Sequence, residues 1–170
     1  MLAVHQKTRS IKLIKKHKKK NYKHVVASNR SLWFADDYRV HLYNPTNQSE
    51  TLHYKSPCKV HKLAVWEKQP VVVCANTVVF LNKDGGSSHK VALKGASSIK
   101  DALFSKNKHV YLTSENLMYV FDLESQNKER FPLSSLAYHS LSWFGEGDIA
   151  VWLDDHIDFF EANSFVVSLK

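Results

Sequence analysis

Short runs of apolar residues recur along this chain at a nearly constant spacing. Four of these runs end at Asn44, Asn82, Asp122 and Glu161, which lie 38, 40 and 39 positions apart. Between them the apolar runs follow one another roughly every ten residues and show no helical period. Turn-forming residues separate the runs at 28–30, 45–47, 84–87 and 145–147. A period near 39 residues built from short strands indicates a repeat of small antiparallel sheets.

The pattern divides the chain into four units of four strands, over residues 24–55, 58–94, 97–133 and 135–170. Strands are predicted over 24–28, 32–35, 39–43, 50–54, 60–66, 71–74, 77–81, 89–93, 99–104, 109–113, 117–121, 128–131, 136–144, 149–153, 156–160 and 165–169. Residues 71–74 and 78–81 are apolar at successive positions, so both faces of their sheet are expected to be buried. Sheets stacked face to face would bury both faces in this way. A two-sheet sandwich with one irregular strand is the alternative, although a sandwich imposes no fixed repeat.

Composition agrees with a folded core and places the charge at one end. Hydrophobic residues make up 44% of the 170 residues and aromatic residues 12%, which excludes disorder throughout. The net charge is +8, but nine of the 24 basic residues and no acidic residue lie within residues 1–23. The other 147 residues hold the remaining 15 basic residues against 16 acidic ones, a net charge of −1. Residues 1–23 are therefore expected to form a flexible basic tail.

The basic tail has four interpretations. The cluster suits a nuclear import signal, which needs a short exposed basic segment. It also suits a sequence-independent RNA or DNA tether that binds phosphates. Attachment to an anionic membrane is a third interpretation, and a solubilising tail with no ligand is a fourth. The lysines concerned are Lys12, Lys15, Lys16, Lys18, Lys19, Lys20 and Lys23.

The third predicted strands carry a resemblance to a known repeat family. Asp37-Tyr-Arg-Val-His-Leu-Tyr-Asn44 has an acidic turn residue, alternating apolar positions, and an aromatic residue followed by a polar one. Residues 75–82, 115–122 and 154–161 align with it. In this respect the chain resembles the WD-repeat proteins, with degenerate repeats that lack the Trp-Asp and Gly-His pairs. The resemblance implies an all-β, β-propeller-like fold of about four four-stranded blades.

Four blades are few for a closed ring of the WD-repeat kind, which mostly has seven. The chain is expected either to be part of a longer propeller or a shortened isoform, to be completed by another chain or by self-association, or to form a four-bladed ring. In each case the turns between second and third strands would share one rim. That rim would collect Asp36, Asp37, Asn76, Glu115, Asn116, Asp154 and Asp155, which would form an acidic docking face for a basic partner or serve only as turn formers.

No motif for catalysis or cofactor binding is evident. Cys58 and Cys74 could form one disulfide, but their spacing suits neither a metal knuckle nor a redox pair, and we expect two reduced, inert thiols. The ten histidines have no zinc-ligand spacing, and no loop has the alternating oxygen ligands of a calcium site. No nucleophile stands on a sharp glycine turn, and no glycine-rich phosphate loop is present. We therefore expect no enzyme activity, no cofactor and no metal.

Trp33, Trp66, Trp143 and Trp152 lie in predicted strands. Such residues usually pack between sheets, and one or two at a rim could anchor a peptide.

The sequence thus predicts a non-enzymatic WD-repeat-like scaffold that joins protein partners in a larger, nuclear complex. The chain has no apolar run of 18 residues and no secretory signal, so an intracellular location is expected, in the nucleus or nucleolus and otherwise in the cytoplasm. The alternative is an RNA-associated subunit in ribosome biogenesis or RNA processing that uses the basic tail.

Overall fold

The chain folds into β-strands throughout its described part. In the computed structural model the described residues are 21–28, 31–82, 84–93, 98–133, 138–144, 148–153, 156–161 and 164–169. These residues form sixteen strands and no helix. Every predicted strand is present, with its ends shifted by two residues or fewer. The all-β prediction is confirmed, and no helix capable of crossing a membrane occurs among these residues.

The strands form four antiparallel sheets, each made of four strands that are consecutive in sequence. The first sheet holds β1 (His24–Ser28), β2 (Ser31–Ala35), β3 (Arg39–Asn44) and β4 (Ser49–Lys55). The second holds β5 (Lys62–Trp66), β6 (Gln69–Val73), β7 (Thr77–Leu81) and β8 (Ser87–Ala92). The third holds β9 (Ile99–Phe104), β10 (Lys108–Thr113), β11 (Leu117–Asp122) and β12 (Lys128–Pro132). The fourth holds β13 (Tyr138–Phe144), β14 (Asp148–Leu153), β15 (Ile157–Glu161) and β16 (Ser164–Leu169).

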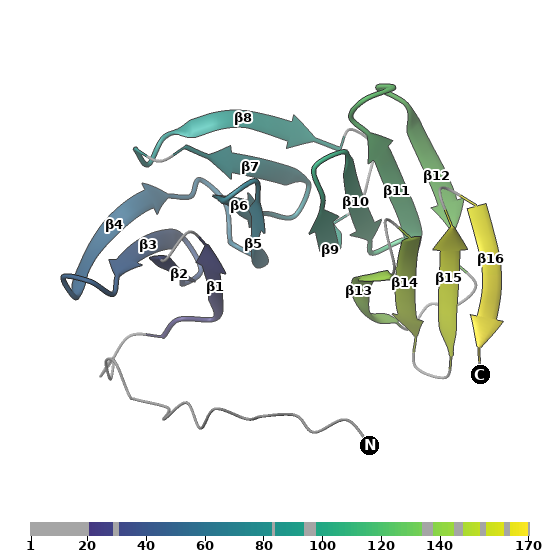
Figure 1. Ribbon diagram of the computed structural model, residues 1–170, viewed down its shortest axis with the longest axis horizontal. Helices are drawn as coiled ribbons and strands as arrows, with labels where there is room; N and C mark the ends of the chain where they lie inside the picture. Colours follow the sequence, from purple (N-terminus) through teal and green to yellow (C-terminus); the bar gives the residue numbers. More distant parts are fainter. Residues whose placement is uncertain are drawn as a thin grey trace, which may run out of the picture.

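The four sheets follow one another along an open arc (Figure 1). The first strand of each sheet, β1, β5, β9 or β13, lies on the inside of the arc, and the last strand lies on the outside. Successive inner strands contact one another, β1 with β5, β5 with β9 and β9 with β13. Each sheet is thus a local meander, and the chain steps to the next sheet by returning from the outer strand to the inside.

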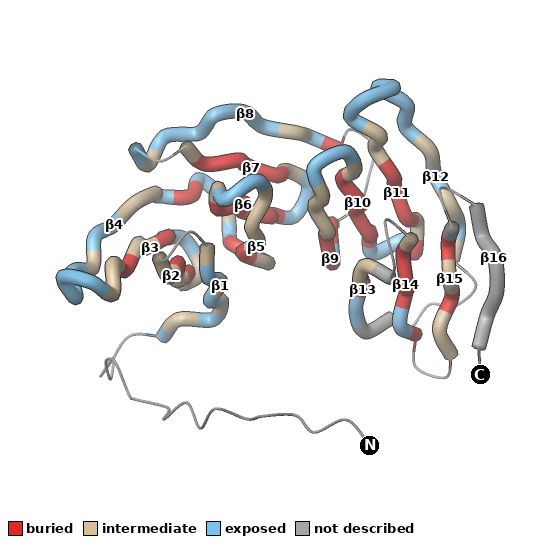
Figure 2. The backbone as a smooth tube through the Cα atoms, viewed as in Figure 1, coloured by how far each residue is buried: buried red, intermediate tan, exposed pale blue. Residues whose placement is uncertain are grey.

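Buried apolar clusters fill the three junctions between neighbouring sheets. Figure 2 shows buried positions along the central strands β6, β7, β10, β11 and β14. Alternation along the strands divides the side chains between the junctions. In β6, Val72 packs toward the first sheet, whereas Val71 and Val73 pack toward the third. In β10, Val110 and Leu112 likewise pack toward the fourth sheet. The successive apolar residues predicted for the central strands therefore reflect a sheet with neighbours on both faces.

The described residues show no fourth cluster that would join the fourth sheet to the first. The first and fourth sheets stand at the two ends of the arc (Figure 1). Each of them buries one face in a junction, and its other face looks out of the arc.

The two cysteines form a disulfide, so the expectation of reduced thiols is wrong. Cys58 lies in the linker that leads to β5, and Cys74 directly follows β6. The linker is held beside the end of β6 because the backbone N–H of His61 donates to the carbonyl of Val73 at 2.8 Å. The two Cα atoms are consequently 6.0 Å apart, a separation that a disulfide spans. Sequence spacing could not reveal this, because the contact forms only when the linker docks on the second sheet.

Candidate functional site

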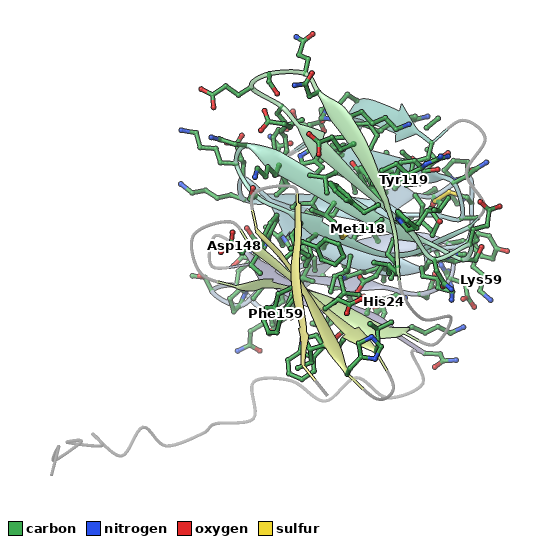
Figure 3. All side chains as sticks on the ribbon, turned by 90° about the vertical axis from the view of Figure 1, so that its right-hand side faces the viewer. His24, Lys59, Met118, Tyr119, Asp148 and Phe159 are labelled. Carbon is green, nitrogen blue, oxygen red and sulfur yellow. A yellow bond between two sulfur atoms is a disulfide. The ribbon has the colours of Figure 1, made fainter. Side chains whose placement is uncertain are left out.

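A basic depression lies where the inner strands begin. It has a volume of about 570 Å³, and the residues lining it come from the approach to β1, from the β2–β3 turn and from the linkers into β5 and β9. We call this depression the mouth. Its charged and ionisable residues are Lys23, His24, Asp37, Lys59, His61 and Lys100. In Figure 3, Lys59 lies toward one broad side of the molecule, and Asp148, the first residue of β14, lies toward the other.

Backbone hydrogen bonds between linkers and turns build this part of the molecule. The N–H of Val60, in the linker after the first sheet, donates to the carbonyl of Asp37 at 2.7 Å. The equivalent bond after the second sheet joins Leu93 to Asn76 at 3.1 Å. After the third sheet, Leu133 donates to Asn116 at 2.9 Å. The turn between the second and third strands of each of these sheets thus holds the linker that leaves for the next sheet.

The carboxylate of Asp37 is paired with lysines. The Lys23 ammonium lies 2.7 Å from an Asp37 oxygen, and the Lys59 ammonium lies 3.9 Å from the same oxygen. The hydrogen bond from Lys23, together with the charges of both lysines, lowers the pKa of Asp37 below its ordinary value. Burial lowers the pKa of His24, and a hydrogen bond with the Val60 backbone partly opposes this shift. Asp37 is therefore ionised, and its charge is matched by the surrounding lysines.

Asp36 is bound within its own turn. Partial burial alone would raise the pKa of Asp36, but hydrogen bonds from the backbone N–H groups of Tyr38 and Arg39 and from the Arg39 guanidinium lower it. The salt bridge between Arg39 and Asp36 is 2.8 Å long. Both acidic residues of this turn are therefore neutralised by basic partners.

The other residues predicted for the rim have different roles. Asn76 is exposed and accepts a hydrogen bond from the Thr77 hydroxyl at 3.2 Å. Glu115 is exposed, whereas Asn116 is buried and has a left-handed backbone with φ of 55°. Asn116 thus acts as a turn former. Asp154 and Asp155 lie outside the described residues.

The described part of the expected tail is held against the first sheet. The Tyr22 hydroxyl donates to Glu50 at 2.6 Å, and its ring stacks on Phe34 with 5.1 Å between centroids. The backbone N–H of Lys23 donates to the carbonyl of Ala35 at 2.9 Å. The ordered contacts of the first sheet therefore begin before β1. Lys12, Lys15, Lys16, Lys18, Lys19 and Lys20 lie outside the described residues.

The outward face of the first sheet presents apolar side chains. A row of paired residues crosses all four strands of this face, Val25, Phe34, His41 and Leu52. Val25 is 61% exposed and Leu52 is 52% exposed. Beside this row lies a groove of about 970 Å³, lined by Tyr22, His41 and the exposed Tyr38 among others. We call this surface the first end face.

The fourth sheet has a comparable exposed residue at the other end of the arc. Trp152 lies on the face opposite Val151, which packs into the third junction. Its side chain is 45% exposed, and its indole N–H donates to the Ser142 hydroxyl at 2.8 Å. Trp33, Trp66 and Trp143 instead pack in the junctions. Of the four tryptophans, Trp152 is therefore the candidate anchor.

A partly buried ion pair links the inner strands and was not predicted from the sequence. Asp101 in β9 pairs with the ammonium of Lys62 in β5 and accepts a hydrogen bond from the backbone N–H of Leu141 in β13 at 3.1 Å. The Asp101 side chain is buried and so joins three sheets. The available signal was an acidic residue in a predicted strand with four apolar residues, Ile99–Phe104.

The described residues include no group of three or more His, Cys, Asp or Glu side chains that could hold a metal ion. The mouth and the outward faces of the end sheets are the candidate surfaces in this part of the chain.

No protein-family model matches the chain, and no curated protein is similar to it. Among solved structures it is similar to the crystal structure of the computationally designed Ika4 protein, with a TM-score of 0.68 and 17% identity. The likeness covers 89% of this chain and 98% of that one. At this level of identity the likeness shows a shared fold and carries no function with it.

Proposed function

We propose that this chain is a non-enzymatic WD-repeat-like scaffold that holds protein partners in a larger, nuclear complex, and that its four sheets are blades of a propeller-like stack. The observation that carries the proposal is the pair of outward faces at the ends of the arc. Sheets within the stack bury both faces, and Val72 and Val71, on opposite faces of the second sheet, are both 0% exposed. Val25 and Leu52, at 61% and 52% exposed, are apolar residues without such cover.

The proposed occupant of the first end face is a β-sheet contributed by a partner protein. Each junction in the arc joins two sheets face to face, so a further sheet would continue an interface that the chain already uses three times. The adjoining groove, with the exposed Tyr38, offers an aromatic anchor beside the apolar row. Rigid sheets present these side chains at a low cost in conformational entropy.

Location in the nucleus rests on the basic tail. Free thiols would have argued for a reducing compartment, but the disulfide between Cys58 and Cys74 removes that argument. The same tail supports the second candidate function, an RNA-associated subunit in ribosome biogenesis or RNA processing. With nine basic and no acidic residues in positions 1–23, such contacts would be electrostatic and would weaken steeply with salt.

The test is capture of partners by the full chain and by variants of the first end face. Val25→Asp with Leu52→Asp places charge on the apolar row, and we expect the yield of a stoichiometric partner to fall at least about tenfold. Leu123→Asp is the matched control, because Leu123 is 40% exposed and lies between β11 and β12, away from either end face. A photo-reactive residue at position 52 should crosslink to that partner, and one at position 123 should not.

Three results would overturn the proposal. The first is that the end-face variant captures the same partners as the Leu123 variant. The second is that light scattering shows the chain dimerising through the first end face with no other partner. The third is that capture requires only RNA and the tail, a result that would favour the second candidate function.

A further inference from the structure

We propose that the mouth binds an acidic peptide segment of a protein partner, a site separate from the first end face. Lys23, Lys59 and Lys100 reach the mouth from three different elements, and Asp37 is the single carboxylate among its lining residues. With histidines neutral, these four groups give a net charge of +2. The described part of the chain thus has a local basic site, to which Lys23 of the tail and two lysines of the near-neutral remainder contribute.

The backbone that carries these lysines is fixed on both sides of the mouth. Lys23 donates its N–H to the Ala35 carbonyl at 2.9 Å, and Val60, next to Lys59, donates to Asp37 at 2.7 Å. Ser98, two residues before Lys100, accepts from the N–H of Ser114 at 2.8 Å. Because these segments are already ordered, little backbone entropy is lost when a ligand binds.

Asp37 already shows how the site holds a carboxylate. The Lys23 ammonium is 2.8 Å or less from both Asp37 oxygens, as in a strong charge-assisted hydrogen bond. Lys59 is 3.9 Å from Asp37, longer than a hydrogen bond, and its side chain is 57% exposed. The Lys59 ammonium is thus placed to take a second carboxylate without losing a hydrogen bond.

The surroundings favour an acidic peptide over the other polyanions. Residues 1–20 of the chain carry eight basic side chains and no acidic one, so they do not suit the mouth as a ligand. A nucleic acid needs a basic surface along its backbone and aromatic platforms for its bases. The mouth is instead a shallow, open depression in which a carboxylate lies between the lysines, and its lining includes no Phe, Tyr or Trp. Separate carboxylates on a peptide can avoid Asp37, whereas evenly spaced phosphates cannot.

The test measures binding of a fluorescein-labelled octaglutamate peptide to the full chain by fluorescence anisotropy. In every protein the basic tail residues before the described part of the chain are replaced by glutamine, so that they cannot bind the probe; these are Lys7, Arg9, Lys12, Lys15, Lys16, Lys18, Lys19 and Lys20. In this background Lys59→Gln with Lys100→Gln should weaken binding at least about tenfold. Lys90→Gln with Lys106→Gln removes the same charge from exposed positions outside the mouth and should change affinity less than about twofold.

A second variant works in the opposite direction. Asp37→Asn removes the carboxylate that competes for Lys23 and Lys59, so it should strengthen peptide binding about threefold. Because all of these side chains are partly or fully exposed, the thermal unfolding midpoint of each variant should match the background protein.

The proposal fails if octaglutamate does not bind the background protein. It fails as well if the Lys59 and Lys100 substitutions and the Lys90 and Lys106 substitutions reduce the affinity for the peptide equally. It also fails if octauridylate RNA binds more tightly than the peptide and loses that affinity in the Lys59 and Lys100 variant, because the mouth would then be a nucleic-acid site. None of these results depends on partner capture at the first end face, so the two proposals stand or fall separately.

Discussion

His109 in β10 is packed among aromatic rings between the second and third sheets. Its ring is 5.1 Å from the Phe80 ring in a stacked arrangement and 5.2 Å from Trp66 edge-on. The side chain is buried, and the Tyr111 hydroxyl lies 3.3 Å from its Nδ1 atom. Burial, with a smaller contribution from His89, lowers the pKa of His109 from 6.5 to about 4. His109 is therefore a neutral aromatic residue of the core at physiological pH.

This packing predicts a loss of stability in mild acid. Between pH 6.5 and about 4 the unfolded chain binds a proton at His109 and the folded chain does not. The free energy of unfolding should therefore fall as the pH falls through this window, with a contribution on the order of 3 kcal/mol from this residue. Urea unfolding of the chain and of His109→Phe at several pH values measures the effect.

The difference between these two unfolding curves isolates His109, because the carboxylates contribute to both. The His109→Phe variant should lose stability less steeply below pH 6.5 than the natural chain. Curves that stay parallel from pH 7 to pH 4 would show that the imidazole is accessible to protons in the folded state.

Single residues were the least predictable level of the structure. Cys58, Asp101 and His109 all stand in segments whose strand or linker character was predicted. Asp101 and His109 meet partners from other sheets, however, and Cys58 meets Cys74 only when its linker docks on the second sheet. Sequence periodicity carries no information about these pairings. The pattern predicted where side chains are buried, and it could not predict which ones meet across a junction.

The β7–β8 turn joins the first two sheets through its backbone. Asn82 anchors the turn, since its Oδ1 atom accepts from the N–H of Gly86 at 2.8 Å. His53 of the first sheet approaches the Asn82 carbonyl at 3.0 Å. Gly85 has φ of +88°, and a Cβ atom there would overlap the carbonyl oxygen of His53. The turn therefore needs glycine at position 85 both for its backbone angle and for its contact with β4.

Gly85→Ala should destabilise the protein by about 2 kcal/mol or more, because a left-handed backbone and a clash with a main-chain oxygen add together. Gly86→Ala is the control in the same turn, where a Cβ atom would meet the Asn82 side chain at 3.2 Å. It should cost less than about 1 kcal/mol, since a side chain can move aside. The urea unfolding midpoints of the two variants measure this difference. Equal losses of stability in the two variants would show that the turn does not dock on β4.

Elements were predicted well because each sheet is assembled from neighbouring strands. Short apolar runs, turn residues and the spacing near 39 residues all act within one unit, so local sequence is enough to place every strand. The central and outer strands of the second sheet also differ in burial. β8 is mostly exposed, whereas β6 and β7 are buried on both faces.

The whole molecule is a linear stack in which each sheet contacts its neighbours. The second and third sheets each have two junctions, and the fourth has one among the described residues. The sequence repeat predicts the number of sheets. The angle between neighbouring sheets depends on the side chains that fill each junction, so the repeat does not predict whether the sheets close into a ring. In such a stack stability is expected to be a sum of local terms, with the end sheets opening most readily.

Two matched isoleucine substitutions test this expectation. Ile149 is buried in the junction between the third and fourth sheets, and Ile99 in the junction between the second and third. Each change to alanine should remove about 3 kcal/mol of packing free energy. Ile149→Ala should speed hydrogen exchange roughly 100-fold in β14 while changing it little in β6 and β7, because the fourth sheet can open alone. Ile99→Ala should raise exchange in β6, β7 and β10 together, since opening the middle junction separates the stack into halves.

If Ile149→Ala instead accelerated hydrogen exchange equally in all four sheets, the arc would unfold as one cooperative unit, and neighbouring sheets would be coupled more strongly than their junctions suggest.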